Sequence, residues 1–128
     1  MKQVLIIDDE PGIRMALKRW FERRGYAVVE AGDGLAASVI LESASTDGPD
    51  ALVVIICDLH LPGLGGDALL ERFATERPVI ASRIILSTGD AIDDLDPETV
   101  IGRHPFLLQK PFDLSTLKLV VDRVLGEA

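Results

Sequence analysis

The chain has 128 residues, of which 48% are hydrophobic, and this is enough apolar material for one domain with one buried core. Its formal net charge of −8 argues against binding to nucleic acid, and no apolar run is long enough to span a bilayer. The single cysteine, Cys57, excludes an intramolecular disulfide and suits a reducing compartment. We therefore expect one cytoplasmic domain over residues 1–128, with neither nucleic acid nor membrane as a partner.

Strand and helix patterns alternate along the chain. The predicted strands are Val4–Ile7, Tyr26–Ala31, a run that begins at Ala51 and ends at Asp58, an apolar run Ile84–Leu86, and Phe106–Gln109. The predicted helices begin at Pro11 and stop before Gly25, span Leu35–Ser43 and Asp67–Glu76, and carry a last apolar stripe from Leu114 to Leu125. This alternation predicts an α/β fold, a doubly wound five-stranded parallel sheet with helices on both faces.

The run from Ala51 to Cys57 is the most informative strand. Its seven residues are all apolar, without the alternation of a strand that has one solvated face. Such a run is typical of a central parallel strand that is covered on both faces. The carboxylate of Asp58 follows directly and needs a polar partner at this position.

The stretch 89–104 is the least regular part of the pattern. Pro97 interrupts it, and acids at positions 93, 94 and 96 crowd its front. Asp96 as the N-cap, with Pro97 and Glu98 in the first turn, predicts a short helix from about Pro97 onward. We expect the rest of this stretch to be irregular and mobile.

Polar, reactive side chains follow four of the five predicted strands. They are Asp8 and Asp9, Asp58, Ser87 with Thr88, and Lys110. In an open parallel sheet ligands bind outside the carboxyl ends of the strands, so these groups should converge.

Three neighbouring carboxylates repel one another and call for a cation, and hard oxygen ligands suit Mg²⁺, with Mn²⁺ as the alternative. The Thr88 hydroxyl and the Lys110 ammonium then suit an incoming phosphoryl group. A carboxylate beside Mg²⁺ can attack phosphorus and form an acyl phosphate.

At these residues the chain resembles a response-regulator receiver domain of two-component signalling. The matching segments are Ile7-Asp8-Asp9-Glu10, Asp58-Leu59-His60-Leu61-Pro62-Gly63, Ser87-Thr88-Gly89 and Lys110-Pro111-Phe112. They stand in the family's order, and the resemblance covers essentially the whole chain. Any one segment alone is a weak signal, whereas the combination is specific.

The resemblance implies the flavodoxin-like strand order 2-1-3-4-5 and a phosphorelay function. Asp58 would accept a phosphoryl group from the phosphohistidine of a sensor kinase or phosphotransfer protein. Asp9, Asp58 and the backbone carbonyl of His60 would ligate Mg²⁺, and Asp8 would act through bound water.

The resemblance also implies that Thr88 and Lys110 hold the phosphoryl oxygens, and that the surface around residues 89–113 changes on phosphorylation. A receiver is a switch and not an enzyme on other substrates, because it promotes only its own phosphorylation and dephosphorylation. Members often have a cis peptide before the proline that is Pro111 here. A fused effector domain or a second copy would bind the face formed by residues 89–128.

One departure from the family leaves an alternative open. Members usually carry a switch aromatic three positions before the lysine, where this chain has Leu107. The adjacent Phe106 points to the opposite face of a strand and does not replace it. The alternative is therefore a phosphorylation-independent, receiver-like scaffold, although the acid pair, Asp58 and Lys110 are all retained.

Other assignments concern residues beside the predicted site. We expect Asp90 to orient an attacking water, His60 to modulate it, and Gly89 to leave the site open, so that together they set the lifetime of the phosphorylated state. Glu10 is the acid expected to cap the first helix. A flavin carrier and an aspartate-nucleophile phosphatase fit less well. Three acids after the first strand repel a flavin phosphate, and the phosphatases usually have Asp where this chain has His60.

Overall fold

The computed structural model describes residues 1–90 and 95–126. In this part of the chain the strands are β1 (Gln3–Ile7), β2 (Ala27–Ala31), β3 (Leu52–Asp58), β4 (Ile84–Thr88) and β5 (Leu107–Gln109). The helices are α1 (Pro11–Glu22), α2 (Gly34–Ser43), α3 (Gly66–Glu76), α4 (Pro78–Ala81), α5 (Val100–Arg103) and α6 (Leu114–Val124). None of the helices in these ranges has the length and apolar content needed to cross a membrane.

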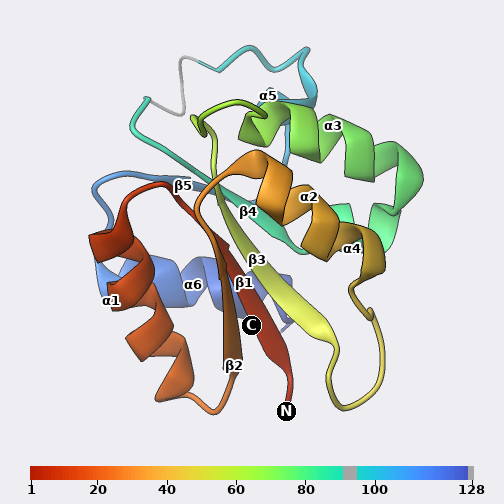
Figure 1. Cartoon of the computed structure of the whole chain (residues 1–128). Helices are drawn as coiled ribbons and strands as arrows, with labels where there is room; N and C mark the ends of the chain where they lie inside the picture. The colour runs from red at the N-terminus through yellow and green to blue at the C-terminus, as the bar shows by residue number, and fades with distance from the viewer. Residues whose placement is uncertain (91–94, 127–128) are drawn as a thin grey trace.

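The strands form one parallel sheet in the order β2-β1-β3-β4-β5, as the sequence predicts (Figure 1). The uninterrupted apolar run becomes β3, which lies at the centre between β1 and β4. In the register of these strands, Ile7 pairs with Cys57, and Asp58 pairs with Ser87. The polar residues that follow the strands therefore meet at one edge of the sheet.

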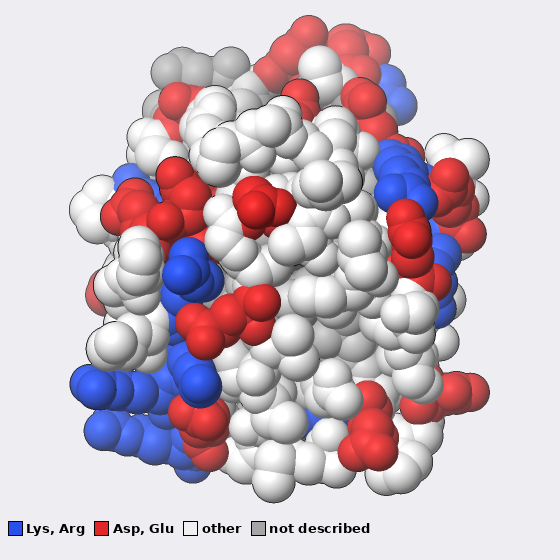
Figure 2. Space-filling model, in the orientation of Figure 1, with Lys and Arg blue, Asp and Glu red and all other residues white. Residues whose placement is uncertain are grey.

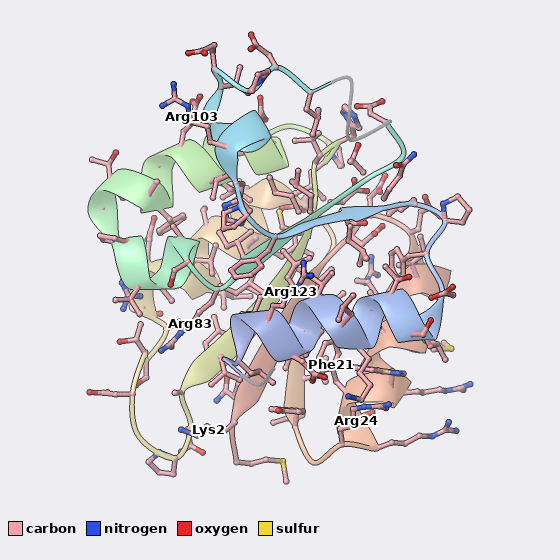
Figure 3. All side chains as sticks on the ribbon, turned by 180° about the vertical axis from the view of Figure 1, so that it is seen from behind. Lys2, Phe21, Arg24, Arg83, Arg103 and Arg123 are labelled. Carbon is pink, nitrogen blue, oxygen red and sulfur yellow. The ribbon has the colours of Figure 1, made fainter. Side chains whose placement is uncertain are left out.

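A separate apolar core lies on each face of the sheet. Helices α2, α3 and α4 cover one face, where Leu41, Phe73 and Ile80 are fully buried against β1, β3 and β4. Helices α1 and α6 cover the other face, and Phe21 is enclosed there with Leu117 (Figures 1 and 3). The doubly wound architecture follows from strands that are apolar on both sides.

Local signals set the ends of several helices. Pro11 is the first residue of α1. After the end of this helix the chain turns at Gly25, whose φ of +90° suits glycine. The Asp33 carboxylate accepts a hydrogen bond of 2.8 Å from the backbone N–H of Ala36 and so caps α2. Asp113 caps α6 in the same way through the N–H of Thr116, also at 2.8 Å.

One predicted boundary was wrong, and one short helix was not predicted. The helix expected from about Pro97 begins at Val100, because residues 97 and 98 form a turn in which Asp96 accepts a hydrogen bond from the N–H of Glu98. The short helix α4, which begins at Pro78, was not predicted, since four residues carry too little periodicity. The expectation for the stretch 89–104 falls partly on residues 91–94, including the acids at 93 and 94, which lie outside the described residues.

Candidate functional site

Three side chains from three different strand ends meet in one contact. The Lys110 ammonium, which follows β5, donates to Asp8 Oδ2 at 2.9 Å and to Asp58 Oδ2 at 3.2 Å. The two carboxylates are almost fully buried, and the lysine side chain is 17% exposed. The predicted convergence of these groups is therefore present, with Lys110 compensating the two carboxylates.

Backbone N–H groups hold the second oxygen of each carboxylate. Asp8 Oδ1 accepts from the N–H of Glu10 at 2.9 Å, and Asp58 Oδ1 accepts from the N–H of His60 at 3.1 Å. Both are bonds from the residue two positions later, a local turn that aspartate forms readily. Each carboxylate is thus fixed by its own loop on one side and by Lys110 on the other.

The environment of Lys110 has two opposing effects on the pKa of its ammonium group. Burial lowers the pKa of the ammonium, while hydrogen bonds and attraction to Asp8 and Asp58 raise it, and the net pKa is raised. Lys110 is therefore protonated throughout the physiological range and supplies a permanent positive charge.

An acidic cluster suited to a cation lies beside this contact. Carboxylate oxygens of Asp8, Asp9 and Glu10 lie within 4.8 Å of one another, and Asp9 and Glu10 are exposed. Hard oxygen donors so close together fit Mg²⁺. In Figure 2 acidic side chains gather near the N-terminal end of α1, whereas basic ones lie over its C-terminal end.

Glu10 lies at the expected end of α1 but does not cap the helix with its side chain. It occupies the N-cap position of α1, but its side chain makes no capping hydrogen bond. Its carboxylate belongs instead to the acidic cluster. The position of Glu10 directly after the acid pair is the sequence signal for this role.

The hydroxyl groups at the end of β4 differ in their bonding. Thr88 Oγ1 accepts a hydrogen bond from the N–H of Asp90 at 3.0 Å, and the backbone carbonyl of Thr88 accepts from the N–H of Lys110 at 2.6 Å. Ser87 Oγ is buried and has no hydrogen-bond partner among the described residues. As registered parallel neighbours, Ser87 and Asp58 point to the same face of the sheet.

Two loops meet across the mouth of the site. His60 Nε2, on the loop after β3, lies 2.7 Å from Asp90 Oδ2, on the loop after β4, and both side chains are exposed. The sequence singled out both residues as modulators, and they contact each other directly. Gly89 lies between Thr88 and Asp90, and a Cβ atom built on it would meet no other described residue within 4 Å.

Leu107 and Phe106 pack on opposite faces of the sheet, as the alternation of a strand predicts. Leu107 contacts the core beneath α2, α3 and α4, and Phe106 contacts the core beneath α1 and α6. Phe106 therefore cannot take the place of an aromatic side chain at position 107.

The peptide bond between Lys110 and Pro111 is cis, as the resemblance implied. It adjoins an apolar groove of about 460 Å³ between α1 and the start of α6. The groove is lined by Glu10, Ile13, Ala16, Leu17, Lys110, Pro111, Phe112 and Leu114. Cys57 lies deep in the sheet, where burial and the neighbouring acids raise the pKa of its thiol, so it belongs to the core and not to the site.

The comparisons with known proteins agree with this geometry. The family model for the response regulator receiver domain matches residues 4–122. The chain therefore belongs to the response regulator receiver domain family, whose members act as signalling switches in two-component systems. This membership confirms the resemblance seen in the sequence.

Individual relatives show how the domain is used elsewhere. Sporulation initiation phosphotransferase F of Bacillus subtilis is 28% identical over 97% of this chain and 94% of its own length. Transcriptional activator protein PfeR of Pseudomonas aeruginosa is 34% identical over 96% of this chain, which spans only 37% of that protein. The response regulator TrrA of Thermotoga maritima, solved in complex with Mg²⁺-BeF, gives a TM-score of 0.79 at 25% identity and covers 97% of this chain and 99% of its own.

Proposed function

We propose that residues 1–128 form one receiver domain that accepts a phosphoryl group on Asp58. The observation that supports this most directly is the Lys110 ammonium shared between Asp8 and Asp58, at 2.9 and 3.2 Å. The contact holds a nearly buried carboxylate at the end of the central strand and leaves a positive charge ready for an incoming phosphoryl group.

The donor set that we propose for a divalent cation combines the acid pair of the acidic cluster with the end of β3 and the loop after it. We assign Asp9, Asp58 and the backbone carbonyl of His60 as direct ligands, with Asp8 acting through bound water. When bound, Mg²⁺ neutralises these carboxylates and the phosphoryl oxygens, and so removes the repulsion between two anions. The TrrA structure contains Mg²⁺-BeF, which supports the choice of Mg²⁺.

In the transfer step an oxygen of the Asp58 carboxylate forms a bond to phosphorus. The bond between phosphorus and the donor's imidazole nitrogen breaks, and that nitrogen leaves with the electron pair. Lys110 then releases the carboxylate and donates to a phosphoryl oxygen. Thr88 turns its hydroxyl from the N–H of Asp90 toward another phosphoryl oxygen.

The exposed His60–Asp90 pair is proposed to set the lifetime of the phosphorylated state. Asp90 orients the water that attacks phosphorus and accepts its proton, and His60 modulates Asp90 through their 2.7 Å contact. Gly89 keeps the approach free of side-chain atoms. Attack by water breaks the phosphorus–oxygen bond, releases inorganic phosphate and regenerates the Asp58 carboxylate.

The signal leaves through the surface around residues 89–113. The phosphodonor is the phosphohistidine of a sensor kinase or phosphotransfer protein, in the cytoplasm. An effector domain or a second copy of the chain binds the face formed by residues 89–128. Leu107 favours the second candidate, a receiver-like scaffold that does not depend on phosphorylation, because it lacks the ring of a switch aromatic.

Incubation of the protein with acetyl phosphate and Mg²⁺ distinguishes the phosphoryl switch from the phosphorylation-independent scaffold. The phosphoryl switch predicts one added phosphoryl group, located at Asp58 by peptide mass mapping and absent from Asp58→Asn. Chelation should abolish labelling, and Mn²⁺ should restore it if the ligand set tolerates either ion. Labelling at another residue, or none with Mg²⁺ present, would overturn the proposal and leave the scaffold.

A further inference from the structure

Arg14 binds the backbone from which the acidic cluster projects. The residue lies on α1, and its Nη1 donates to the backbone carbonyl of Asp8 at 2.5 Å. Its Nε lies 3.5 Å from Glu30 Oε1 on β2, and the arginine side chain is 21% exposed. One planar guanidinium therefore joins the end of β1, the first helix and the neighbouring strand.

The contact between Arg14 and Asp8 lies beside three carboxylates that repel one another. After Ile7 the chain leaves the sheet, and the carboxylates of Asp8, Asp9 and Glu10 then lie within 4.8 Å of one another. Their mutual repulsion favours opening of the turn. A charge-assisted hydrogen bond to the carbonyl of Asp8 opposes that movement without using any carboxylate oxygen of the cluster.

We propose that Arg14 is a positioning residue for the divalent cation of the acidic cluster, and that Glu30 fixes Arg14. The inference rests on the proposed function, since it assumes that the cluster binds Mg²⁺. It assigns Arg14 no contact with the cation. The arginine acts through the backbone of Asp8, as residues behind metal ligands commonly do.

The charge of Arg14 and its position have opposite effects on metal affinity. A positive charge near a cation site weakens binding, so its removal alone tightens binding. Loss of the hydrogen bond frees the Asp8 turn and weakens binding. Arg14→Met removes both charge and donor, and the sign of the change in the Mg²⁺ dissociation constant shows which effect is larger.

Lys18 offers a matched control on the same helix. Its ammonium lies 3.8 Å from Glu30 Oε2, and within the described residues it forms no hydrogen bond or ion pair with Asp8. Lys18→Met therefore removes one positive charge from the same neighbourhood and leaves the turn intact. In Figure 2 basic side chains continue along α1 below its acidic end.

Two further variants separate the two contacts of Arg14. Arg14→Lys keeps the charge, but a single ammonium does not reproduce the fork that reaches Asp8 and Glu30 together. Glu30→Gln removes the charge that anchors the guanidinium and keeps an acceptor oxygen. Both should raise the Mg²⁺ dissociation constant above the wild-type value, because each disturbs the donor that holds the carbonyl of Asp8.

Isothermal titration with Mg²⁺ gives the dissociation constant of each variant, and urea unfolding without metal shows whether each remains folded. Arg14→Met should raise the dissociation constant by about tenfold, within the range for residues behind metal ligands. Lys18→Met should leave it unchanged or lower it. The inference would be overturned if folded Arg14→Met had an unchanged or lower Mg²⁺ dissociation constant. It would also be overturned if Arg14→Lys had the same dissociation constant as wild type. Wild-type protein that binds no Mg²⁺ would instead overturn the metal site of the proposed function.

Discussion

The backbone of Gly66 lies directly against that of Asp58. A Cβ atom added to Gly66 would lie 2.5 Å from the carbonyl oxygen of Asp58, and the N–H of Gly66 donates to the carbonyl of Leu59 at 3.0 Å. The first turn of α3 is therefore packed onto the end of β3, and only a residue without a side chain fits between them.

Gly66→Ala should destabilise the fold, because the new methyl group meets backbone and not a flexible side chain. We expect the free energy of unfolding to fall by about 1–3 kcal/mol, the usual cost of overpacking. Urea unfolding followed by circular dichroism measures the change. Gly12→Ala is the matched control, since open space surrounds Gly12 on α1. It should raise stability by roughly 0.5–1 kcal/mol, and an equal loss in both variants would contradict the packing argument.

Asp90→Ala should slow the loss of phosphoryl groups from Asp58, because the water that attacks phosphorus loses the carboxylate that orients it. We expect the decay rate to fall by about tenfold, below the usual contribution of a positioned acid–base group. The protein is labelled with acetyl phosphate, freed from donor, and followed by intact mass. Asp47→Ala, in the loop before β3, should decay like wild type. Decay of Asp90→Ala at the wild-type rate would show that Asp90 has no part in the step.

Ser87→Ala should stabilise the protein, because the Ser87 hydroxyl is buried and no group in residues 1–90 or 95–126 forms a hydrogen bond with it. Removing an unsatisfied polar group recovers its desolvation cost, and we expect a gain of about 1 kcal/mol in the free energy of unfolding. Ser38→Ala is the comparison, since Ser38 is also buried but donates to the carbonyl of Leu35 at 2.7 Å. An equal gain in both variants would mean that the missing partner is not the cause.

His104 should make stability depend on pH below neutrality. Burial lowers the pKa of its imidazole from the ordinary 6.5, and a hydrogen bond from Nε2 to the carbonyl of Ile84 offsets this only in part. As the pH is lowered, His104 therefore becomes protonated at a higher pH in the unfolded chain than in the folded protein. The free energy of unfolding should therefore decrease as the pH drops from about 7.5 through the ordinary value.

The control for this pH dependence is His104→Gln, which keeps an N–H donor for Ile84 and removes the titration. Urea unfolding at a series of pH values should give a flatter profile for this variant between about pH 7.5 and 5.5. Parallel profiles for the two proteins would assign the slope to other groups.

The sequence predicts the sheet and the main contact because both depend on simple patterns. The apolar run before Asp58 has the pattern of a central strand, and parallel strands bring their carboxyl ends to one edge, so the contact with Lys110 follows. The role that we propose for Arg14 cannot be predicted from such patterns alone. Its contacts with Asp8 and Glu30 depend on how α1 lies against β2, which helical spacing alone does not define.

Short elements and loop contacts were the other features that the pattern did not specify. The four residues from Pro78 form a single helical turn, and so short a segment has no measurable period. The contact between His60 and Asp90 joins two loops, and loop conformation is set by tertiary packing.

The single thiol lies at the middle of the sheet, with Cys57 only 1% exposed and its pKa raised by burial. Alkylating reagents attack the thiolate, so the folded protein should react only when the central strand separates from its neighbours. The alkylation rate of wild-type protein therefore reports how often the sheet opens. Measured with and without Mg²⁺, this rate shows whether a cation bound at the carboxyl edge of the sheet slows that opening.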